Sequence, residues 1–531
     1  MRNIVSSRRF VLSAIMAAQF VCAPMLAIAQ TGGFGITPIV KRGDPVSDGG
    51  RFFDCADCQG RVIGLHAFNN RGDVAIAAEV VAGTCFSNRF LISAGESIRL
   101  ADFCQTTEFG KLTFLGPVNI NESGQAAINT GVTIDNRIVE MILLSGDGQP
   151  TKIVEEGDIS PRGTIFKGCG FGQPAINNNG EVAFFACGET NEGRFSDGVY
   201  RYSAGEMSKV VVSEDPSPIG GTFALNFFPA QPVQMNDRGD VLFRAGVIID
   251  PAAKEKFGLF LATQDGFRKV EVDGERLPSG EQIKDGSFGI GDLNSKGDVA
   301  FVVGLAGQFD GGIFLYSGGS ISKVVVAGDP SPIGGTFSPF DRGETQPFPL
   351  PHINGNGAVA FKAFVTNGSA SNGVFLASSK ASIKVVAVGD QLPTGETIRV
   401  IDTFALNDLG QVAFFAYGKK NGTKPLGVYL ATPVSPRISS IKLKQKTGGF
   451  QLRVNGAGMI TNDTVVEIDG IALGALDYPM DYREDGGTIT RVVSRDSRLA
   501  QLLQPGQTVQ VSVYNPLTNL RSAAVSFTRS T

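Results

Sequence analysis

The chain repeats itself with a period of about 57 residues. The nine letters DPSPIGGTF occur at 215–223 and again, unchanged, at 329–337, two periods apart. A second motif, Asn-x-x-Gly, runs in phase with the first, and its copies begin at Asn69, Asn121, Asn177, Asn236, Asn294, Asn354 and Asn407. Seven in-phase copies of one unit predict a fold built from seven equivalent modules.

Each unit reads as four short strands. The Asn-x-x-Gly segment suits a tight turn, because Asn can cap the turn with its side chain and Gly accepts a positive φ. The segment after it, such as VAFFA at 182–186, is apolar on both faces and predicts a strand covered from both sides. GVYRY at 198–202 and KVVVSED at 209–215 are typical of the third and fourth strands.

The two ends of the repeat region complement each other. The last unit stops after GVYLAT at 427–432 and lacks a fourth strand, whereas TPIVKRGDPV at 37–46 is a fourth strand with no first three before it. We therefore predict an all-β protein with a seven-bladed β-propeller over 34–433, built of four-stranded blades and closed by the N-terminal strand. A linear solenoid is the alternative, but it would expose two edge strands and require polar caps, which the sequence does not show.

Residues 437–531 leave the repeat pattern. FQLRVNGAGM, TVVEIDGIAL and TVQVSVYNPL read as strands separated by turns. The number and length of these strands predict an immunoglobulin-like β-sandwich as a second domain.

The repeat motif resembles that of the bacterial exported proteins named for tandem NxxGxxAF repeats, over about 34–432. This resemblance implies an exported repeat protein and assigns no activity, cofactor or catalytic residue. The strings VNGAG at 454–458 and YNP at 514–516 resemble an IPT/TIG-type immunoglobulin-like domain. That second resemblance implies a module that binds other proteins or acts as a spacer.

Residues 1–29 have the features of a secretory signal peptide. Three arginines precede an apolar run at 11–25, and Ala-Ile-Ala at 27–29 is a small-x-small cleavage site. We predict cleavage before Gln30 and export to the periplasm or the exterior. The stretch around Arg8-Arg9 partly resembles a twin-arginine signal, so both the Sec and the Tat routes stay open. No later apolar stretch reaches the roughly 18 residues of a membrane span.

Composition agrees with this assignment. The chain has 68 glycines and 38 phenylalanines but no tryptophan, which is typical of many short strands and turns. Without the signal segment, 44 Lys and Arg stand against 51 Asp and Glu, a net charge of −7 with histidine neutral. A mildly acidic chain without basic clusters argues against nucleic acid as a partner.

Six cysteines follow the signal segment, all before residue 190. An even number in an oxidising compartment predicts disulfides. Cys169 and Cys187 flank the Asn177 turn almost symmetrically, so we predict that they pair. For the other four, the first prediction is Cys55–Cys85 with Cys58–Cys104, and the alternative is Cys58–Cys85 with Cys55–Cys104.

An acidic residue recurs near the loop after each fourth strand, at Asp44, Asp102, Asp158, Asp215, Glu275, Asp329 and Asp390. In a propeller these loops share one face, so the acids are candidate binding residues that would form a ring for a cation or a basic ligand. We favour the structural interpretation, in which each acid stabilises its own Gly- and Pro-rich turn. No sequence motif indicates a cofactor, although such a ring would suit a structural Ca²⁺.

Two further features have simple structural interpretations. Arg71-Gly72-Asp73 and Arg238-Gly239-Asp240 spell a cell-adhesion tripeptide, but both fall in the Asn-x-x-Gly-Asp register, so turn chemistry accounts for them. The two histidines, His66 and His352, occupy unequal positions in their units, and we interpret them as packing residues. The sequence contains no G-x-S-x-G elbow, phosphate loop or HExxH motif.

These observations favour an exported, non-catalytic binding or scaffold protein. Its variable loops, for example 188–197 and 246–257, should share a face with the recurring acids and contact a protein or glycan ligand of the cell envelope. The alternative is a carbohydrate-active hydrolase or lyase in which two carboxylates converge to about 5–10 Å.

Overall fold

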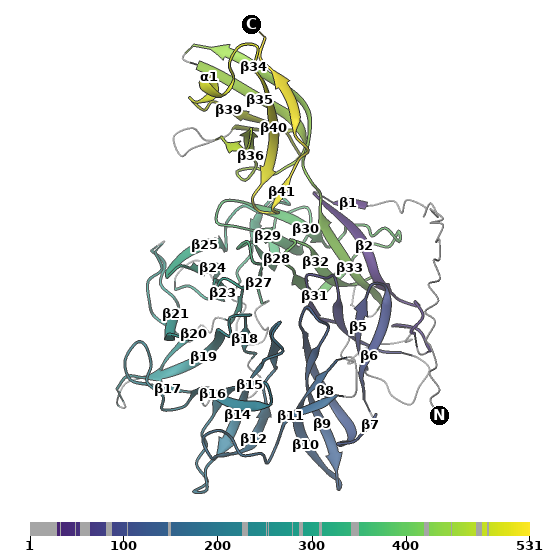
Figure 1. Cartoon of the computed structure of the whole chain (residues 1–531), viewed down its shortest axis with the longest axis vertical. Helices are drawn as coiled ribbons and strands as arrows, with labels where there is room; N and C mark the ends of the chain where they lie inside the picture. Colours follow the sequence, from purple (N-terminus) through teal and green to yellow (C-terminus); the bar gives the residue numbers. More distant parts are fainter. Residues whose placement is uncertain are drawn as a thin grey trace, which may run out of the picture.

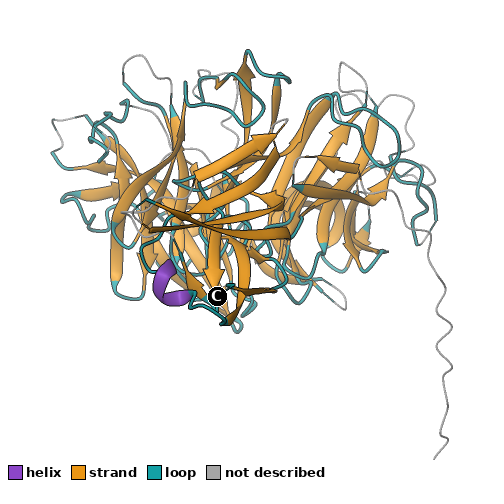
Figure 2. Cartoon of the chain, turned by 90° about the horizontal axis from the view of Figure 1, so that it is seen from above, coloured by secondary structure: helices purple, strands orange, loops and turns teal. Residues whose placement is uncertain are grey.

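The computed structural model describes residues 29–31, 33–47, 49–53, 64–80, 88–103, 105–146, 150–225, 232–250, 252, 254–278, 280–285, 290–306, 311–340, 350–418, 424–447, 449–473, 481–485 and 488–530. Within these residues the regular structure is almost entirely β-strand, and Figure 2 shows one short helix, α1 (Leu499–Leu502), in the C-terminal part. The prediction of an all-β protein is confirmed.

Seven antiparallel sheets follow one another along the repeat region, and Figure 1 shows them around a common centre. The first contains β3 (Gly64–Phe68), β4 (Val74–Ala78), β5 (Asn88–Ser93) and β6 (Glu96–Asp102). The second contains β7 (Thr106–Thr107), β8 (Gly110–Ile120), β9 (Ala126–Ile134), β10 (Arg137–Ser145) and β11 (Thr151–Glu155). The third contains β12 (Ile165–Phe171), β13 (Ala175–Ile176), β14 (Val182–Glu189), β15 (Gly198–Ser203) and β16 (Glu206–Val212).

The next three sheets have the same order of strands. The fourth contains β17 (Thr222–Ala224), β18 (Gln234–Met235), β19 (Val241–Ile248), β20 (Lys256–Thr263) and β21 (Gly266–Val272). The fifth contains β22 (Ile290–Leu293), β23 (Val299–Val303), β24 (Gly312–Ser317) and β25 (Ser320–Val326). The sixth contains β26 (Thr336–Phe337), β27 (His352–Ile353), β28 (Val359–Thr366), β29 (Asn372–Ala377) and β30 (Ser382–Ala387).

The seventh sheet joins the two ends of the repeat region. It contains β31 (Val400–Leu406), β32 (Val412–Tyr417) and β33 (Pro425–Pro433), and its order continues through β2 (Phe34–Lys41) to β1 (Ala29–Thr31). Pro38 lies opposite Tyr429 in the β2–β33 ladder. The N-terminal strand therefore supplies the fourth strand that the last unit lacks, and Figure 1 shows β2 beside β33.

The expected four strands per unit are exceeded in two sheets. The second sheet gains the two-residue strand β7, which pairs with the start of β8, and the seventh gains β1. In the third, fourth and sixth sheets the first strand is divided into two short segments. In the third sheet the first of these segments, β12, also contains a bulge between Phe166 and Phe171, which lifts the intervening residues out of the ladder.

The hydrophobic core lies between neighbouring sheets. The second strand of each unit contributes much of this core. In β14, for example, residues Val182–Ala186 are buried on both faces of the sheet, as their apolar sequence predicts. One cluster, for example, joins Phe185 and Val199 of the third sheet to Phe243 and Phe260 of the fourth. Each sheet is therefore packed against its neighbours and is not an independent unit.

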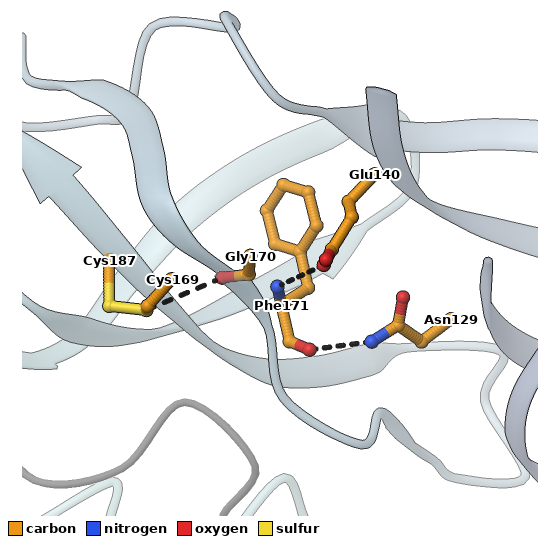
Figure 3. Close-up of a disulfide and its surroundings, with 6 residues drawn as sticks. All are labelled: Asn129, Glu140, Cys169, Gly170, Phe171 and Cys187. Carbon is orange, nitrogen blue, oxygen red and sulfur yellow. Dashed lines mark hydrogen bonds between the residues drawn. A yellow bond between two sulfur atoms is a disulfide. The ribbon is translucent and has the colours of Figure 1, made fainter. Parts of the chain in front are cut away.

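The disulfide Cys169–Cys187 is present, so that predicted pairing is confirmed. Figure 3 shows it beside the bulged part of β12. The neighbouring sheet satisfies the bulged backbone, because Asn129 Nδ2 donates to the Phe171 carbonyl (2.5 Å) and Glu140 Oε2 accepts from the Phe171 N–H (3.2 Å). Burial raises the pKa of Glu140. The other four cysteines, Cys55, Cys58, Cys85 and Cys104, lie outside the described residues.

The C-terminal part forms two further antiparallel sheets. One contains β34 (Arg437–Lys446), β35 (Gly449–Met459), β39 (Thr488–Ser494) and β38 (Asp481–Asp485). The other contains β37 (Ile471–Ala472), β36 (Val465–Ile468), β40 (Thr508–Asn515), β41 (Leu520–Arg521) and β42 (Val525–Thr528). Leu452, Val466 and Val511 belong to one core shared by both sheets.

The C-terminal part contacts the seventh sheet of the repeat region. Ile460 and Leu517 are buried in the same cluster as Phe34 and Ile36 of β2. This apolar contact fixes the C-terminal part at the closing sheet, and Figure 1 shows it above β2 and β33.

Candidate functional site

The asparagine that opens each Asn-x-x-Gly turn is buried, and in the turns at Asn69, Asn177, Asn236 and Asn294 it makes four hydrogen bonds. Asn236 Oδ1 accepts from the N–H groups of Arg238 (3.1 Å) and Asp240 (3.0 Å). Its Nδ2 donates to Asp240 Oδ2 (2.9 Å) and to the carbonyl of Asn294 in the next unit (3.1 Å). The spacing of the motif follows from this geometry, and Gly239 has the positive φ of 77° that the turn requires.

These asparagines link six of the seven pairs of neighbouring units, and we call the linked set the asparagine circuit. Six of the links from Nδ2 to the carbonyl of the next asparagine are Asn69 to Asn121, Asn121 to Asn177, Asn177 to Asn236, Asn236 to Asn294, Asn294 to Asn354, and Asn407 to Asn69. The last link spans 338 residues of sequence and measures 3.3 Å. The turns therefore form a rigid rim at one end of the seven sheets.

The Arg-Gly-Asp tripeptides belong to this rim. Asp73 and Asp240 are buried, with side chains 4% and 7% exposed, and each accepts a hydrogen bond from the asparagine that opens its turn. A carboxylate buried in this way is not available to a receptor. The interpretation as turn chemistry is the one that the geometry supports.

The recurring acids lie in the loops at the opposite end of the sheets, because antiparallel strands reverse direction at each turn. Most of them accept a hydrogen bond from a backbone N–H three residues earlier: Asp44 from Lys41 (2.8 Å), Asp158 from Glu155 (2.9 Å), Asp215 from Val212 (2.9 Å), Asp329 from Val326 (2.9 Å) and Asp390 from Ala387 (2.8 Å). Glu275 instead accepts from Lys269 Nζ (2.6 Å), and Asp102 pairs with Arg99. Each acid thus has partners in the fourth strand or loop beside it, and a role for these residues in binding stays a prediction.

The two histidines join neighbouring sheets at different positions. His66 Nδ1 accepts from the Val118 N–H of the second sheet (3.2 Å). His352 lies 3.5 Å from Asp292 Oδ2, and its ring packs edge-on against Phe404. Because each histidine has a different structural neighbour, the geometry agrees with packing roles.

His66 gives the fold an acid-sensitive contact. Burial lowers the pKa of His66 to about 3, and the Arg89 guanidinium contributes to the shift. His66 therefore supports the fold fully above its ordinary pKa of 6.5, and this support is lost as the pH falls from 6.5 toward 3, because only the unfolded chain takes up the proton.

We expect protonation of His66 alone to lower the free energy of unfolding by about 2 kcal/mol between pH 6.5 and about 4.5. One proton taken up only by the unfolded chain changes this free energy by at most ~1.4 kcal/mol per pH unit, and the change is smaller here because the ring is not completely shielded from water. The measurement is urea denaturation across this range for the wild type and His66→Asn, which keeps an acceptor for Val118 and does not titrate. Parallel pH profiles for the two proteins would contradict the assignment.

A polar cleft lies on the Asn-turn rim between the third and fourth sheets. Its volume is about 660 Å³. It is formed by turn residues, the starts of two second strands, one third strand and the β20–β21 hairpin. Every lining residue is polar: Asn179, Glu181, Arg201, Asp237, Arg238, Asp240, Thr263, Gln264, Asp265 and Arg268. The cleft lies at the opposite end of the sheets from the recurring acids and the variable second-to-third-strand loops.

Most charges in the cleft are paired. Arg238 Nε donates to Asp240 Oδ2 (2.9 Å), and Arg268 Nη2 donates to Asp265 Oδ2 (3.2 Å). Asp237 accepts from the N–H and the side-chain amide of Asn178 (both 2.8 Å), and Glu181 accepts from Asn177 (2.7 Å). These bonds fix the side chains in place and leave the lining close to charge balance.

Arg201 on β15 differs from these residues. Its Nε is buried and has no hydrogen-bond partner in the described structure. The guanidinium lies against the Asn-x-x-Gly turn of the fourth sheet. A β-carbon added to Gly239 in that turn would be only 2.9 Å from Arg201 Nη1. The cleft is thus lined by an arginine whose buried Nε the protein leaves unsatisfied, together with carboxylate and amide acceptors.

Sequence reasoning did not identify this cleft. It named Arg238 and Asp240 only as parts of an Arg-Gly-Asp string. The overlooked signal is the arginine in GVYRY at 198–202, a motif whose copies GLFLA, GIFLY, GVFLA and GVYLA carry leucine at that place.

A metal or membrane site is not seen among the described residues. Nowhere in this part of the chain do three or more His, Cys, Asp or Glu side chains gather as a metal site requires. The helix α1, with four residues, is far shorter than a bilayer-spanning helix, and no other described segment meets that requirement as a helix.

A family model, described as a family of unknown function (DUF7453), matches residues 68–428. The chain belongs to the DUF7453 family. The match includes all seven Asn-x-x-Gly turns and ends before the two C-terminal sheets, so the repeat region is what this chain shares with DUF7453. A search of curated proteins finds no match.

Solved structures give distant similarities to this DUF7453 member. A Dyadobacter fermentans protein of unknown function has 12% identity and a TM-score of 0.30, with 62% of this chain and 96% of that chain covered. The uncharacterized protein lmo1340 of Listeria monocytogenes has 9% identity and a TM-score of 0.35, with 68% and 94% covered. The polysaccharide lyase Uly1 has 10% identity and a TM-score of 0.38, with 76% and 99% covered. Similarity at this level carries no argument about activity.

Proposed function

We propose that this DUF7453 protein is an exported, non-catalytic binding protein that holds a neutral, hydroxyl-rich saccharide in the polar cleft. The repeat region would be a seven-bladed β-propeller closed by β2, and the C-terminal sheets an immunoglobulin-like module of the IPT/TIG type. The β2–β33 ladder and the asparagine circuit support closure, and the two-sheet core supports the second module. The signal-peptide features of residues 1–29 support export to the periplasm or the exterior.

The observation that carries this proposal is that every residue lining the 660 Å³ cleft is polar. Sites for drug-like molecules are mostly apolar, and the centres of protein interfaces contain apolar anchors. A cleft whose lining residues all carry guanidinium, carboxylate, amide or hydroxyl groups instead suits a ligand covered with groups that both donate and accept hydrogen bonds. Sugar hydroxyls have this property.

Charge balance favours a neutral saccharide. Three arginines and four carboxylates line the cleft, and two of the arginines already pair with carboxylates. An ionised ligand would meet a like charge within the same small volume, whereas hydroxyl groups can accept from Arg201 and donate to Glu181 or Asp237 without this cost.

The test is a glycan array with the purified chain, followed by titration calorimetry with the best neutral oligosaccharide. We expect saturable binding with a Kd on the order of micromolar to millimolar, as for other small polar sites. No binding to any neutral glycan would contradict the proposal. Release of shortened or unsaturated products would replace it with the carbohydrate-active enzyme that the sequence left as the alternative.

A further inference from the structure

The seven units provide an internal comparison for Arg201. In every unit the ladder between the third and fourth strands contains a bulge, which gives the units a common reference point. We compare the third-strand residue that lies two positions after the residue preceding this bulge. Arg201 holds this place in the third sheet, and the other six sheets all carry leucine there: Leu91, Leu144, Leu261, Leu315, Leu376 and Leu430. The cleft is therefore found where the repeat departs from its own pattern.

The packing between sheets does not require an arginine at this position, because the other six units have leucine there. Leu91, Leu261 and Leu376 are buried in the apolar contacts between sheets, and Leu144, Leu315 and Leu430 pack against those contacts. An arginine with an unsatisfied buried Nε is less favourable there than leucine, since burying a donor without a partner costs free energy. Functional sites are where a sequence breaks the local rule of its fold.

We infer that Arg201 is the residue that anchors the saccharide and selects for a pair of adjacent hydroxyl groups. The two Nη groups at the end of the Arg201 guanidinium present parallel N–H donors toward the cleft, which match two oxygen acceptors side by side. Neighbouring hydroxyls on a sugar ring supply such a pair, and their hydrogens can be donated to the carboxylates of Glu181 and Asp237, which also line the cleft. This inference rests on the proposed function and names the part of the ligand that is recognised.

Arg201→Leu tests this role, because it restores the residue of the other six units. We expect the variant to fold with a melting temperature equal to or above that of the wild type, and to bind the array-identified oligosaccharide about 10- to 100-fold more weakly, the range for loss of a charged hydrogen-bond donor. Arg201→Lys should lose about 10-fold, since the ammonium keeps the charge but not the two parallel donors. The matched control is Arg137→Leu, an exposed arginine at the start of β10 outside the cleft, which should bind as the wild type does.

The outcomes separate the two proposals. If the wild type binds no neutral saccharide, the proposed function fails and this inference fails with it. If the wild type binds and Arg201→Leu binds equally well, only the inference is overturned. A lower melting temperature for Arg201→Leu would show a structural role and overturn it as well. Tighter binding of a carboxylated saccharide or an acidic peptide, lost in Arg201→Leu, would replace the hydroxyl pair with a carboxylate.

Discussion

Replacing Phe34 by alanine is expected to lower the apparent free energy of unfolding by about 3–5 kcal/mol, the usual cost of removing a fully buried phenylalanine. Phe34 is 0% exposed and lies in β2, opposite Pro433 at the end of β33. Its cluster includes Leu406 of β31 and Leu517 of the C-terminal part. The substitution therefore weakens the contact through which the N-terminal strand completes the seventh sheet.

The matched control is Thr37→Ala in the same strand. Thr37 is exposed and lies opposite Leu430, so its loss should cost less than about 0.5 kcal/mol. Because the chain has no tryptophan, far-ultraviolet circular dichroism during urea denaturation is the suitable measurement. Equal stability of the two variants would show that β2 does not complete the sheet.

The repeat made the architecture predictable from the sequence. Seven in-phase turns indicated seven sheets, and the surplus strand at 37–46 indicated its place beside GVYLAT at 427–432. Both inferences depend on local rules, namely turn chemistry and strand periodicity, which a repeated unit presents seven times over. The Cys169–Cys187 pair followed from the same turn, since it fixes which residues come close.

The candidate site was not predictable in the same way. The recurring acids attracted attention because they recur, yet recurrence is also what a structural role in every unit produces. Asp215, Asp329 and Asp390, for example, each accept from the end of the strand just before them. Arg201 occurs once, so a search for shared features passes over it. Its surroundings in the cleft come from two different units, and none of these residues accepts a hydrogen bond from its Nε. The linear sequence does not show which residues of two units lie together.

The asparagine circuit leads to the second large effect. Asn294 is 4% exposed, and its Oδ1 accepts from the N–H groups of Lys296 (3.0 Å) and Asp298 (2.9 Å). Its Nδ2 donates to Asp298 Oδ2 and to the Asn354 carbonyl (both 3.0 Å). Asn294→Ala removes all four bonds at once and leaves buried backbone groups unsatisfied, so we expect a loss of about 3 kcal/mol in the free energy of unfolding.

A companion variant separates the acceptor from the donor. Asn294→Asp keeps the shape and the acceptor for the turn, but it sets a second carboxylate against Asp298 and removes the link to Asn354, so it should be at least as unstable as Asn294→Ala near neutral pH. The control is Asn356→Ala, an exposed asparagine in the next turn whose side chain makes one long bond to the Asp408 carbonyl (3.3 Å), with an expected loss of about 0.5 kcal/mol. If Asn294→Ala and Asn356→Ala are equally stable in urea denaturation, neither the turn bonds of Asn294 nor its link to the next unit stabilises the fold.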